Sequence, residues 1–430
     1  MKAERKMLGM SSLLALVRNE FNQFKEPSPS SSYPLVDCLS SALAMFNLKM
    51  PSLLQFTEGF KSGALPNNLL KLFNITAVPS DTHLRVRLDD VAPSPMQYIY
   101  DVLIKELQRS QVLSDFQYYQ DYYLLALDGT GYFNSNIIHC NNCCVKQHKD
   151  GKVSYYHQAL SAVLLHPHIK SVFPLSMEPI IRSDGNAKND CERNASKRLL
   201  VRLRTSHPNL KLVIVMDALY ANAPIIKLLN ELDLRYIITG KNLAHMYDQF
   251  KHGGKMQTRI AKAGHILSEY KFANTLELNE TNPELKVNYI EYLESGGKKS
   301  FFNSWITDIF LSTDDINKIV LCARARWHIE NETFNTLKNQ GYHFEHNYGH
   351  GYKNLSVVLC HLMFIAFLID QIQAYCGYHF KQMKLQVKNY IWEKLRNIFT
   401  TVVVDSWEEF YHMVIILYTG KAKLAVVKSP

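Results

Sequence analysis

At 430 residues the chain is longer than one hydrophobic core usually serves, so two or three domains are expected. Its hydrophobic fraction of 47% and charged fraction of 20% exclude a disordered chain and are typical of a globular protein. The net charge of +9 suits a polyanionic partner such as DNA, but the excess is too modest to establish one.

Neither the first residues nor the most apolar run predicts a membrane protein. The first 21 residues lack the continuous apolar stretch and the cleavage site of a secretory signal. Residues 355–370 are the most apolar run, but this run is short for a membrane span and contains His361, so we expect a buried core helix. We therefore expect a cytoplasmic protein without a membrane partner, whose eight cysteines do not form disulfides.

The expected elements change near residue 120 from helices to alternating strands and helices. Residues 1–118 have helical periodicity, interrupted by a Pro/Ser-rich break at 26–34. Strands flanked by helices then predict an α/β core with a mixed, buried sheet. The elements expected in this core are strands over 122–127, 134–147, 152–165, 210–217 and 235–241, and helices over 186–206 and 224–233.

Residues 243–311 break this alternation and predict a β-rich insertion. The expected strands lie within 258–272, 276–280, 285–294 and 301–310, and polar turns separate them. A capping pattern from Ser312 to Asp315 then opens a long helix over 316–340. The chain after Tyr342 is expected to be mostly helical.

Three carboxylates form the strongest candidate site. Two predicted central strands end in Asp128 and Asp217, and Glu330 lies on the long helix after the insertion. One aspartate at a strand end is more often a turn or a cap, but the three together suit Mg²⁺, which prefers oxygen ligands. Two such ions about 4 Å apart can activate a water or a 3′-hydroxyl in phosphoryl transfer.

The long helix adds two basic candidates. On a regular helix, at about 100° per residue, Arg326, Glu330 and Lys338 lie on one stripe, whereas Glu332 lies on the opposite side. Arg326 is then placed to steady the carboxylate or a phosphate, and Lys338 to meet the DNA backbone. The alternative is an exposed ion pair of the kind that many helices carry.

The three acidic segments resemble a known family. LLALDGTGYF, LVIVMDALY and ARARWHIENETFNTLKNQGY are similar to the acidic motifs of DDE insertion-sequence transposases of the insertion-sequence-four family. The resemblance covers residues 120–375 and implies a ribonuclease H-like core with a β-rich insertion before the last glutamate. It implies Asp128, Asp217 and Glu330 as a catalytic triad that binds Mg²⁺, with Mn²⁺ as a substitute, accompanied by Arg326 and Lys338.

Two departures from the family pattern affect the long helix. The family usually has tyrosine where this chain has Ala323, and six residues between the glutamate and the lysine where this chain has seven. These departures bear on the basic residues and leave Glu332 as an alternative to Glu330.

The resemblance implies a DNA transposase that cuts at the terminal repeats of a mobile element and joins the ends to target DNA. It also implies a two-metal mechanism through a hairpin intermediate, a homodimer on paired DNA ends, and a nucleoid-associated protein. Two alternatives stay open: a catalytically inactive relative that binds DNA, and a nuclease of the same fold without strand transfer. The β-rich insertion favours the transposase, because a minimal nuclease does not need it.

The expected organisation has five parts. They are a helical region that binds DNA ends (1–118), the first part of the core (119–242), the β-rich insertion (243–311), the last part of the core with the glutamate helix (312–375), and a helical region for dimerisation (376–430).

Two groups of soft ligands are candidate metal sites. His139, Cys140, Cys143 and Cys144, with His148 and Cys191 nearby, are rich in zinc ligands but lack a second well-spaced pair. Strand alternation would also place Cys143 opposite Cys140 and Cys144, so core or surface thiols are favoured. For His343, His346 and His350 a loop of polar caps is favoured over a metal site.

Other candidates have a structural and a functional interpretation each. Trp305 is either a core residue of the insertion or an aromatic side chain that stacks on a flipped base, as in related transposases. Arg198 and Arg202 share a helix face that is either solvated or in contact with phosphate. Asp190 and Glu192, near Lys188, either complement a helix dipole or support the metal ligands.

Overall fold

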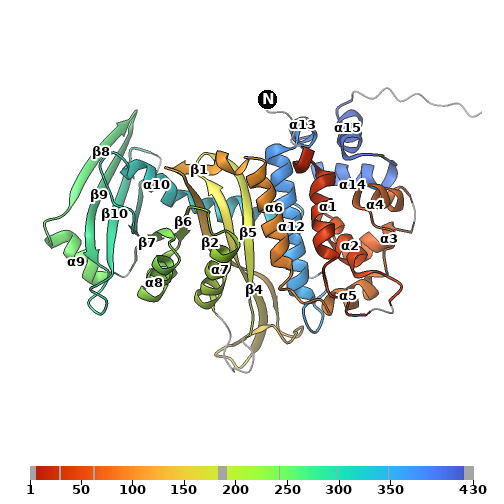
Figure 1. Cartoon of the computed structure of the whole chain (residues 1–430), viewed down its shortest axis with the longest axis horizontal. Coiled ribbons are helices and arrows are strands. Elements are labelled where there is room, and N and C mark those ends of the chain that lie inside the picture. The colour runs from red at the N-terminus through yellow and green to blue at the C-terminus, as the bar shows by residue number, and fades with distance from the viewer. Residues whose placement is uncertain are drawn as a thin grey trace, which may run out of the picture.

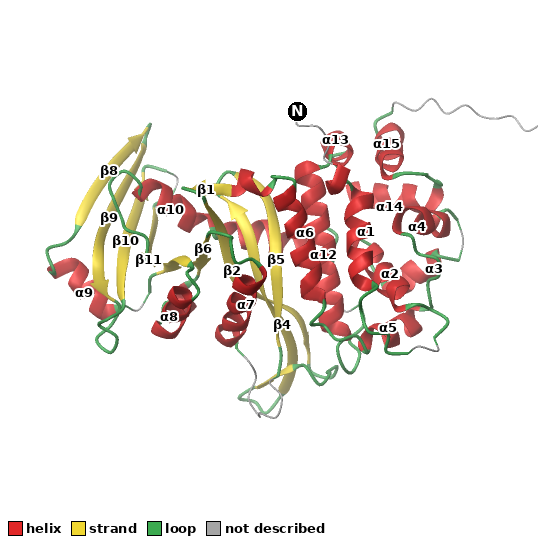
Figure 2. Cartoon of the chain, in the orientation of Figure 1, coloured by secondary structure: helices red, strands yellow, loops and turns green. Residues whose placement is uncertain are grey.

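A mixed sheet of eleven strands runs through the computed structural model, with a lobe of helices at one end (Figure 1). The structure describes residues 6–28, 31–61, 63–182, 191–241, 243–297, 299–346 and 348–420. Most helices gather in the lobe, whereas other helices flank the sheet, one of them beside its outermost strands (Figure 2). This arrangement confirms the expected α/β class and is consistent with a ribonuclease H-like fold.

The helical lobe combines the two ends of the chain. Its N-terminal members are η1 (Lys6–Leu8), α1 (Met10–Phe21), α2 (Leu35–Asn47), α3 (Leu53–Gly59), α4 (Leu65–Phe73), α5 (Asp81–Asp89), α6 (Met96–Arg109) and η2 (Leu113–Phe116). Its C-terminal members are α12 (Leu355–Cys376), α13 (Tyr378–Gln386), α14 (Ile391–Thr401) and α15 (Trp407–Tyr418). Their apolar side chains belong to the same continuous core as those of the sheet.

Helix α12 is the central helix of this lobe and contacts both α2 and the sheet (Figure 1). Its length and composition would allow it to cross a membrane, but 89% of its most apolar window is buried inside the protein. The residues 355–370 are therefore the core helix that their short apolar run predicted. A buried ion pair between Lys49, just after α2, and Asp370 on α12 joins the N-terminal helices to this helix.

The core sheet contains three parallel strands and an antiparallel meander. Its strands are β1 (Gln117–Tyr119), β2 (Tyr122–Ser135), β3 (Cys144–Gln147), β4 (Val153–His166), β5 (Ile169–Ile180), β6 (Leu212–Met216) and β7 (Arg235–Thr239). β2 pairs with β6 and β6 with β7 in parallel, whereas β4 is antiparallel to β2, β3 and β5. All five residues of β6 are buried, because helices cover both of its faces. The helices of this part are α7 (Glu192–Ser206), η3 (Ala218–Tyr220) and α8 (Ala223–Glu231).

The expected insertion is β-rich, and its strands extend the core sheet. After α9 (Ala244–His252) come β8 (Gln257–Ala263), β9 (Ile266–Glu277), β10 (Lys286–Ser295) and β11 (Phe301–Thr307). These four strands form an antiparallel ribbon, and β11 pairs with β7 through Trp305–Thr239, Ile306–Ile238 and Thr307–Ile237. The sheet therefore runs without interruption from β3 to β8.

The prediction of one continuous α-helix over 316–340 is wrong. Helix α10 (Ile316–Ala325) is followed by a π-helical segment, η4 (Ile329–Phe334), and then by the short α11 (Asn335–Asn339). A π turn takes up one residue more than an α turn, and such segments are frequent at functional sites. The placement of Glu330 and Lys338 on one regular stripe therefore does not hold.

Candidate active site

Asp128 and Asp217 lie side by side on neighbouring parallel strands. The register between β2 and β6 pairs Ala126 with Val215, and two residues further along it places Asp128 beside Asp217. Asp217 follows the last residue of β6 and accepts a hydrogen bond of 2.8 Å from the backbone N–H of Leu219. Asp128 does not end its strand as predicted, because β2 continues to Ser135. Both carboxylates nevertheless come from the rigid centre of the sheet.

Arg326 connects the first aspartate to the helical glutamate. Its Nη1 lies 3.0 Å from Oδ2 of Asp128, and its Nη2 lies 2.8 Å from Oε1 of Glu330. Glu330 is the second residue of the π segment. The structure thus brings Asp128, Glu330 and Arg326 together, although 198 residues separate Asp128 from Arg326.

The π segment also bears on the spacing between Glu330 and Lys338. Seven residues separate the two, one more than the family pattern has. A π turn accommodates one additional residue without ending the helix. The sequence departure and the structural irregularity therefore fall on the same stretch of chain.

The pKa of Asp128 is raised in this site. Burial raises the pKa of Asp128 to about 6; Arg326 opposes this shift, while the charges of Glu330, Glu192 and Asp217 add to it. A carboxylate that is 17% exposed and surrounded by acids favours a bound cation or a proton. The oxygen donors of these side chains suit Mg²⁺ or Mn²⁺. Arg326 lies between the carboxylates of Asp128 and Glu330.

Glu192 is a fourth carboxylate at this site. It begins α7, and the hydroxyl of Tyr220 donates a hydrogen bond of 2.7 Å to its Oε1. Burial raises the pKa of Glu192, the hydrogen bond from Tyr220 lowers it, and the charge of Asp217 raises it further. Its Oε2 lies so close to β2 that a Cβ on Gly129 would approach it to 2.6 Å. Glu192 lies in the first turn of α7, where it complements the helix dipole, and it also lies beside β2 near the acidic side chains, so both alternatives stay open. Lys188 and Asp190 lie outside the described residues.

A cavity of about 580 Å³ opens beside Asp217 and Arg326. Trp305 from β11 and Trp327 from the turn before the π segment both line it. Trp305 is only 2% exposed and forms part of the insertion's core, whereas Trp327 is 61% exposed. Lys241, which the sequence analysis did not single out, adds a positive charge to the wall. The cavity thus combines the carboxylate of Asp217 with cations and aromatic rings.

The remaining basic candidates are paired within the chain. Lys338 lies 2.8 Å from Glu345 and is not in contact with the triad in any recorded ion pair of the described residues. Arg198 and Arg202 bond the two carboxylate oxygens of Glu178, at 2.8 and 2.6 Å. Their side chains are still 47% and 30% exposed, so each retains surface that faces solvent.

Comparison with known proteins agrees with this geometry. The family model of the transposase DDE domain matches residues 169–369, and no curated protein matches the chain. The matched span begins after Asp128 and includes Asp217, the β-rich insertion and the π segment with Glu330. It confirms the resemblance at the level of DDE-type transposases and does not address the insertion-sequence-four subdivision. Residues 169–369 therefore match the DDE domain of transposases, with Asp217 and Glu330 inside the matched span.

Proposed function

We propose that the protein cleaves the ends of a mobile DNA element and transfers these ends to target DNA. The observation that carries this proposal is that Asp128 and Glu330 share Arg326, with Asp217 on the strand beside Asp128, next to a cavity lined by cations and aromatic rings. Inactive relatives of an enzyme have no need to retain a buried acid cluster that raises the pKa of Asp128.

In this proposal Asp128, Asp217 and Glu330 hold Mg²⁺, or Mn²⁺ as a substitute. The bound cations would supply activation of a water or 3′-hydroxyl and neutralisation of charge on the phosphate. Asp128 and Asp217 would hold the metal from the sheet, and Glu330 from the π segment. Glu192 would keep these carboxylates in place from α7. Arg326, which pairs with Asp128 and Glu330 in this structure, would be placed to bind the scissile phosphate through its guanidinium group.

The cavity beside Asp217 is proposed to take a base flipped out of a DNA hairpin. Trp327 offers an exposed ring for stacking, and the buried Trp305 forms the opposite wall. Stacking of a base on an aromatic ring contributes about 1–3 kcal/mol, which is enough to hold a strained hairpin end. Lys241 is placed to contact the phosphate beside that base.

The remaining DNA contacts and the assembly are proposed from the same resemblance. Lys338, Arg198 and Arg202 contact the DNA backbone on the face that remains exposed. The helical region 1–118 binds the element ends, 119–242 and 312–375 form the catalytic core around the 243–311 insertion, and 376–430 supports a homodimer. The protein acts in the cytoplasm on nucleoid DNA.

The test is a cleavage and strand-transfer assay on DNA that carries the ends flanking the gene, with Mg²⁺. Asp128→Asn, Asp217→Asn and Glu330→Gln should still bind these ends but neither cut nor join them. Glu332→Gln is the matched control on the same segment and should retain activity. If wild type binds the ends and never cuts, the protein is an inactive DNA-binding relative. If it cuts but never joins, it is a nuclease of the same fold.

A further inference from the structure

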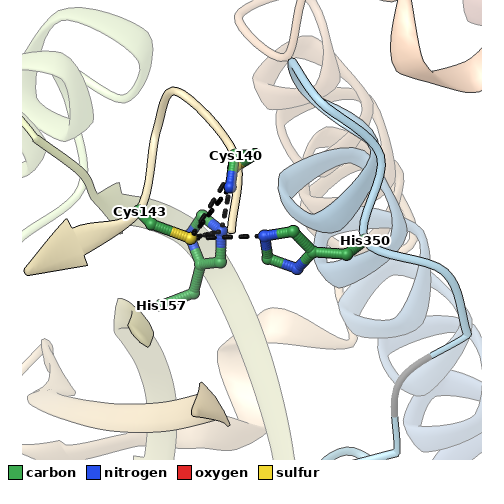
Figure 3. Close-up of side chains that lie close together, drawn as sticks. All are labelled: Cys140, Cys143, His157 and His350. Carbon is green, nitrogen blue, oxygen red and sulfur yellow. Dashed lines mark hydrogen bonds between the residues drawn. The ribbon is translucent and has the colours of Figure 1, made fainter. Parts of the chain in front are cut away.

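Two cysteines and two histidines from three separate segments meet in the interior, away from the acid cluster. Cys140 and Cys143 belong to the loop between β2 and β3, His157 lies on β4, and His350 lies in the loop before α12. All four are buried, and their ligand atoms lie within 4.8 Å of one another. Figure 3 shows the Cys143 sulfur facing both imidazoles.

The separations match a tetrahedral metal site. The two sulfur atoms are 3.8 Å apart, and Nε2 of His157 lies 3.3 Å from Sγ of Cys140 and 3.4 Å from Sγ of Cys143. Nε2 of His350 lies 3.2 Å from Sγ of Cys143. A tetrahedral zinc site with Zn–S near 2.3 Å and Zn–N near 2.0 Å requires S–S of about 3.8 Å and S–N of about 3.5 Å. The four side chains are therefore spaced for zinc with little rearrangement.

Hydrogen bonding alone accounts poorly for this cluster. Sγ of Cys143 lies within reach of Cys140 Sγ and of both imidazoles, but a thiol has a single proton to donate. It also accepts the backbone N–H of Cys140 at 3.4 Å, an interaction that suits a thiolate. Two thiolates and Zn²⁺ would together carry no net charge, which removes the penalty for burying them.

Aromatic neighbours fix the orientation of both imidazoles. Tyr132 stacks on His157 with ring centroids 5.6 Å apart, and Phe133 stacks on His350 at 4.1 Å. Both rings direct Nε2 at the sulfur atoms, and Nδ1 of each is buried without a partner among the described residues. The set contains no carboxylate, so its soft donors select zinc over Mg²⁺, and four protein ligands leave no open position for a substrate.

Hydrogen bonds align the two loops that supply three of these ligands. Asn142 donates to the carbonyl of Lys353 at 2.7 Å, and the N–H of Asn141 donates to the carbonyl of Tyr352 at 3.2 Å. The carboxylate of Asp89 accepts the backbone N–H groups of Tyr352 and Lys353 from the other side. The loop that carries His350 is therefore held at the place where the other ligands converge.

We propose that Cys140, Cys143, His157 and His350 bind one structural zinc ion that fastens the loop before α12 to the β2–β3 loop and β4. Tyr132, which packs on the site, lies four residues beyond Asp128 on β2, and His350 follows the segment that carries Glu330. The zinc would thus fasten the chain just beyond both acidic residues. This proposal does not depend on the proposed transposition activity.

In the sequence these cysteines stand next to other possible ligands, His139, Cys144 and His148. Cys140 and Cys143 flank a turn, not a strand, so the alternation argument against a shared site is wrong. His139 is exposed and stacks on Tyr155, and the thiol of Cys144 is directed at the carbonyl of Ile180. His350 was grouped with His343 and His346, neither of which belongs to the cluster.

The test measures metal content of the full-length protein purified without chelators. Wild type should contain about one zinc per chain, as four-ligand structural sites do, and Cys143→Ser and His350→Gln should contain close to none. Cys144→Ser is the matched control, because it changes an adjacent buried thiol outside the cluster, and it should retain its zinc. Asp217→Asn should retain zinc as well, which separates this site from the acid cluster.

Cobalt titration of metal-stripped wild type keeps the test decisive if a ligand variant fails to fold. Tetrahedral Co²⁺ with two thiolates should give intense visible absorption and a thiolate-to-metal band, saturating at about one equivalent. Zinc well below one per chain together with no Co²⁺ spectrum would overturn the proposal. A Cys140–Cys143 disulfide in freshly purified protein would overturn it too; it would be detected as a mass lower by two hydrogen atoms and as thiols that resist alkylation in denaturant with chelator.

Discussion

Replacing Gly129 by alanine perturbs the acid cluster through a single contact. Gly129 follows Asp128 on β2, and a Cβ at this position would lie 2.6 Å from Oε2 of Glu192 and 2.8 Å from its Cδ. Ordinary contacts begin at 3.4 Å, so the carboxylate of Glu192 must retreat from 2.6 Å to at least that distance. Gly129 does not have a positive φ, so alanine causes no backbone strain there and the clash alone determines the effect of the substitution.

The retreat has a cost that can be calculated from the neighbouring hydrogen bond. Glu192 accepts the hydroxyl of Tyr220 at 2.7 Å, and a displacement of this size stretches that bond to the limit of hydrogen bonding. Loss of a hydrogen bond to a charged group costs about 1.5–3 kcal/mol, so Gly129→Ala should lower the free energy of unfolding by this amount. If Glu192 supports the metal ligands, DNA cleavage should also slow by about 10- to 100-fold.

Urea denaturation and the cleavage assay together measure both effects. Gly131→Ala on the same strand is the matched control, because its Cβ would meet only the carbonyl oxygen of His157, at 3.9 Å. In a Glu192→Ala background, Gly129→Ala should change stability by less than about 0.5 kcal/mol, since the clashing group is gone. An equal loss in both backgrounds, or an equal loss in Gly131→Ala, would refute the reasoning.

Four further outcomes follow from buried charges and exposed rings. Asp128→Asn should abolish cleavage yet stabilise the metal-free protein by up to about 3 kcal/mol at pH 7, because the pKa of Asp128 is raised to about 6 in the folded state. This gain in stability should vanish below about pH 4, where Asp128 is protonated in both states, and urea denaturation between pH 4 and 7 measures it. Lys49→Met should destabilise the protein by about 3–5 kcal/mol in thermal unfolding, since it leaves buried Asp370 without its cation. Burial lowers the pKa of His361 to about 3, so the imidazole is neutral in the folded protein. The free energy of unfolding should therefore fall by about 1.4 kcal/mol per pH unit as the pH drops from about 6.5 to 3. His361→Phe should reduce this slope in acid titrations. Trp327→Ala should slow hairpin processing by at least about fivefold while the initial nick is unaffected, as gel kinetics with nicked and hairpin substrates would resolve.

The sequence located the strands and acids that short-range patterns encode. Apolar runs that end in a carboxylate identified β2 and β6 together with Asp128 and Asp217, because a strand buried on both faces is continuously hydrophobic. In the insertion, the expected strands 285–294 and 301–310 correspond to β10 and β11. The expected strand 258–272 instead merges β8 with part of β9, and 276–280 only overlaps the end of β9. These features depend on neighbours in the chain, which is why they can be read without the fold.

Features that depend on distant segments were missed or misplaced. His157 and His350 join the same cluster from positions 193 residues apart, a distance no ligand spacing could reveal. Arg198 and Arg202 were expected to face solvent or phosphate, but Glu178 on a separate strand pairs with both. The π segment was hidden because its residues, IENETF, are also acceptable in an α-helix. Only the one-residue departure from the family spacing pointed to it.

The pairing of β11 with β7 has a consequence for how the protein unfolds. Because backbone hydrogen bonds cross this junction, the ribbon β8–β11 and the strand that precedes the active-site cavity should exchange their amide hydrogens as one cooperative unit. Excision of the ribbon would leave the backbone groups of β7 unpaired along an apolar strand, a template for aggregation. The intact sheet instead ends at β8, whose exposed Lys262 and partly exposed Arg259 discourage edge-to-edge association. The ribbon therefore also covers the edge that β7 would otherwise expose.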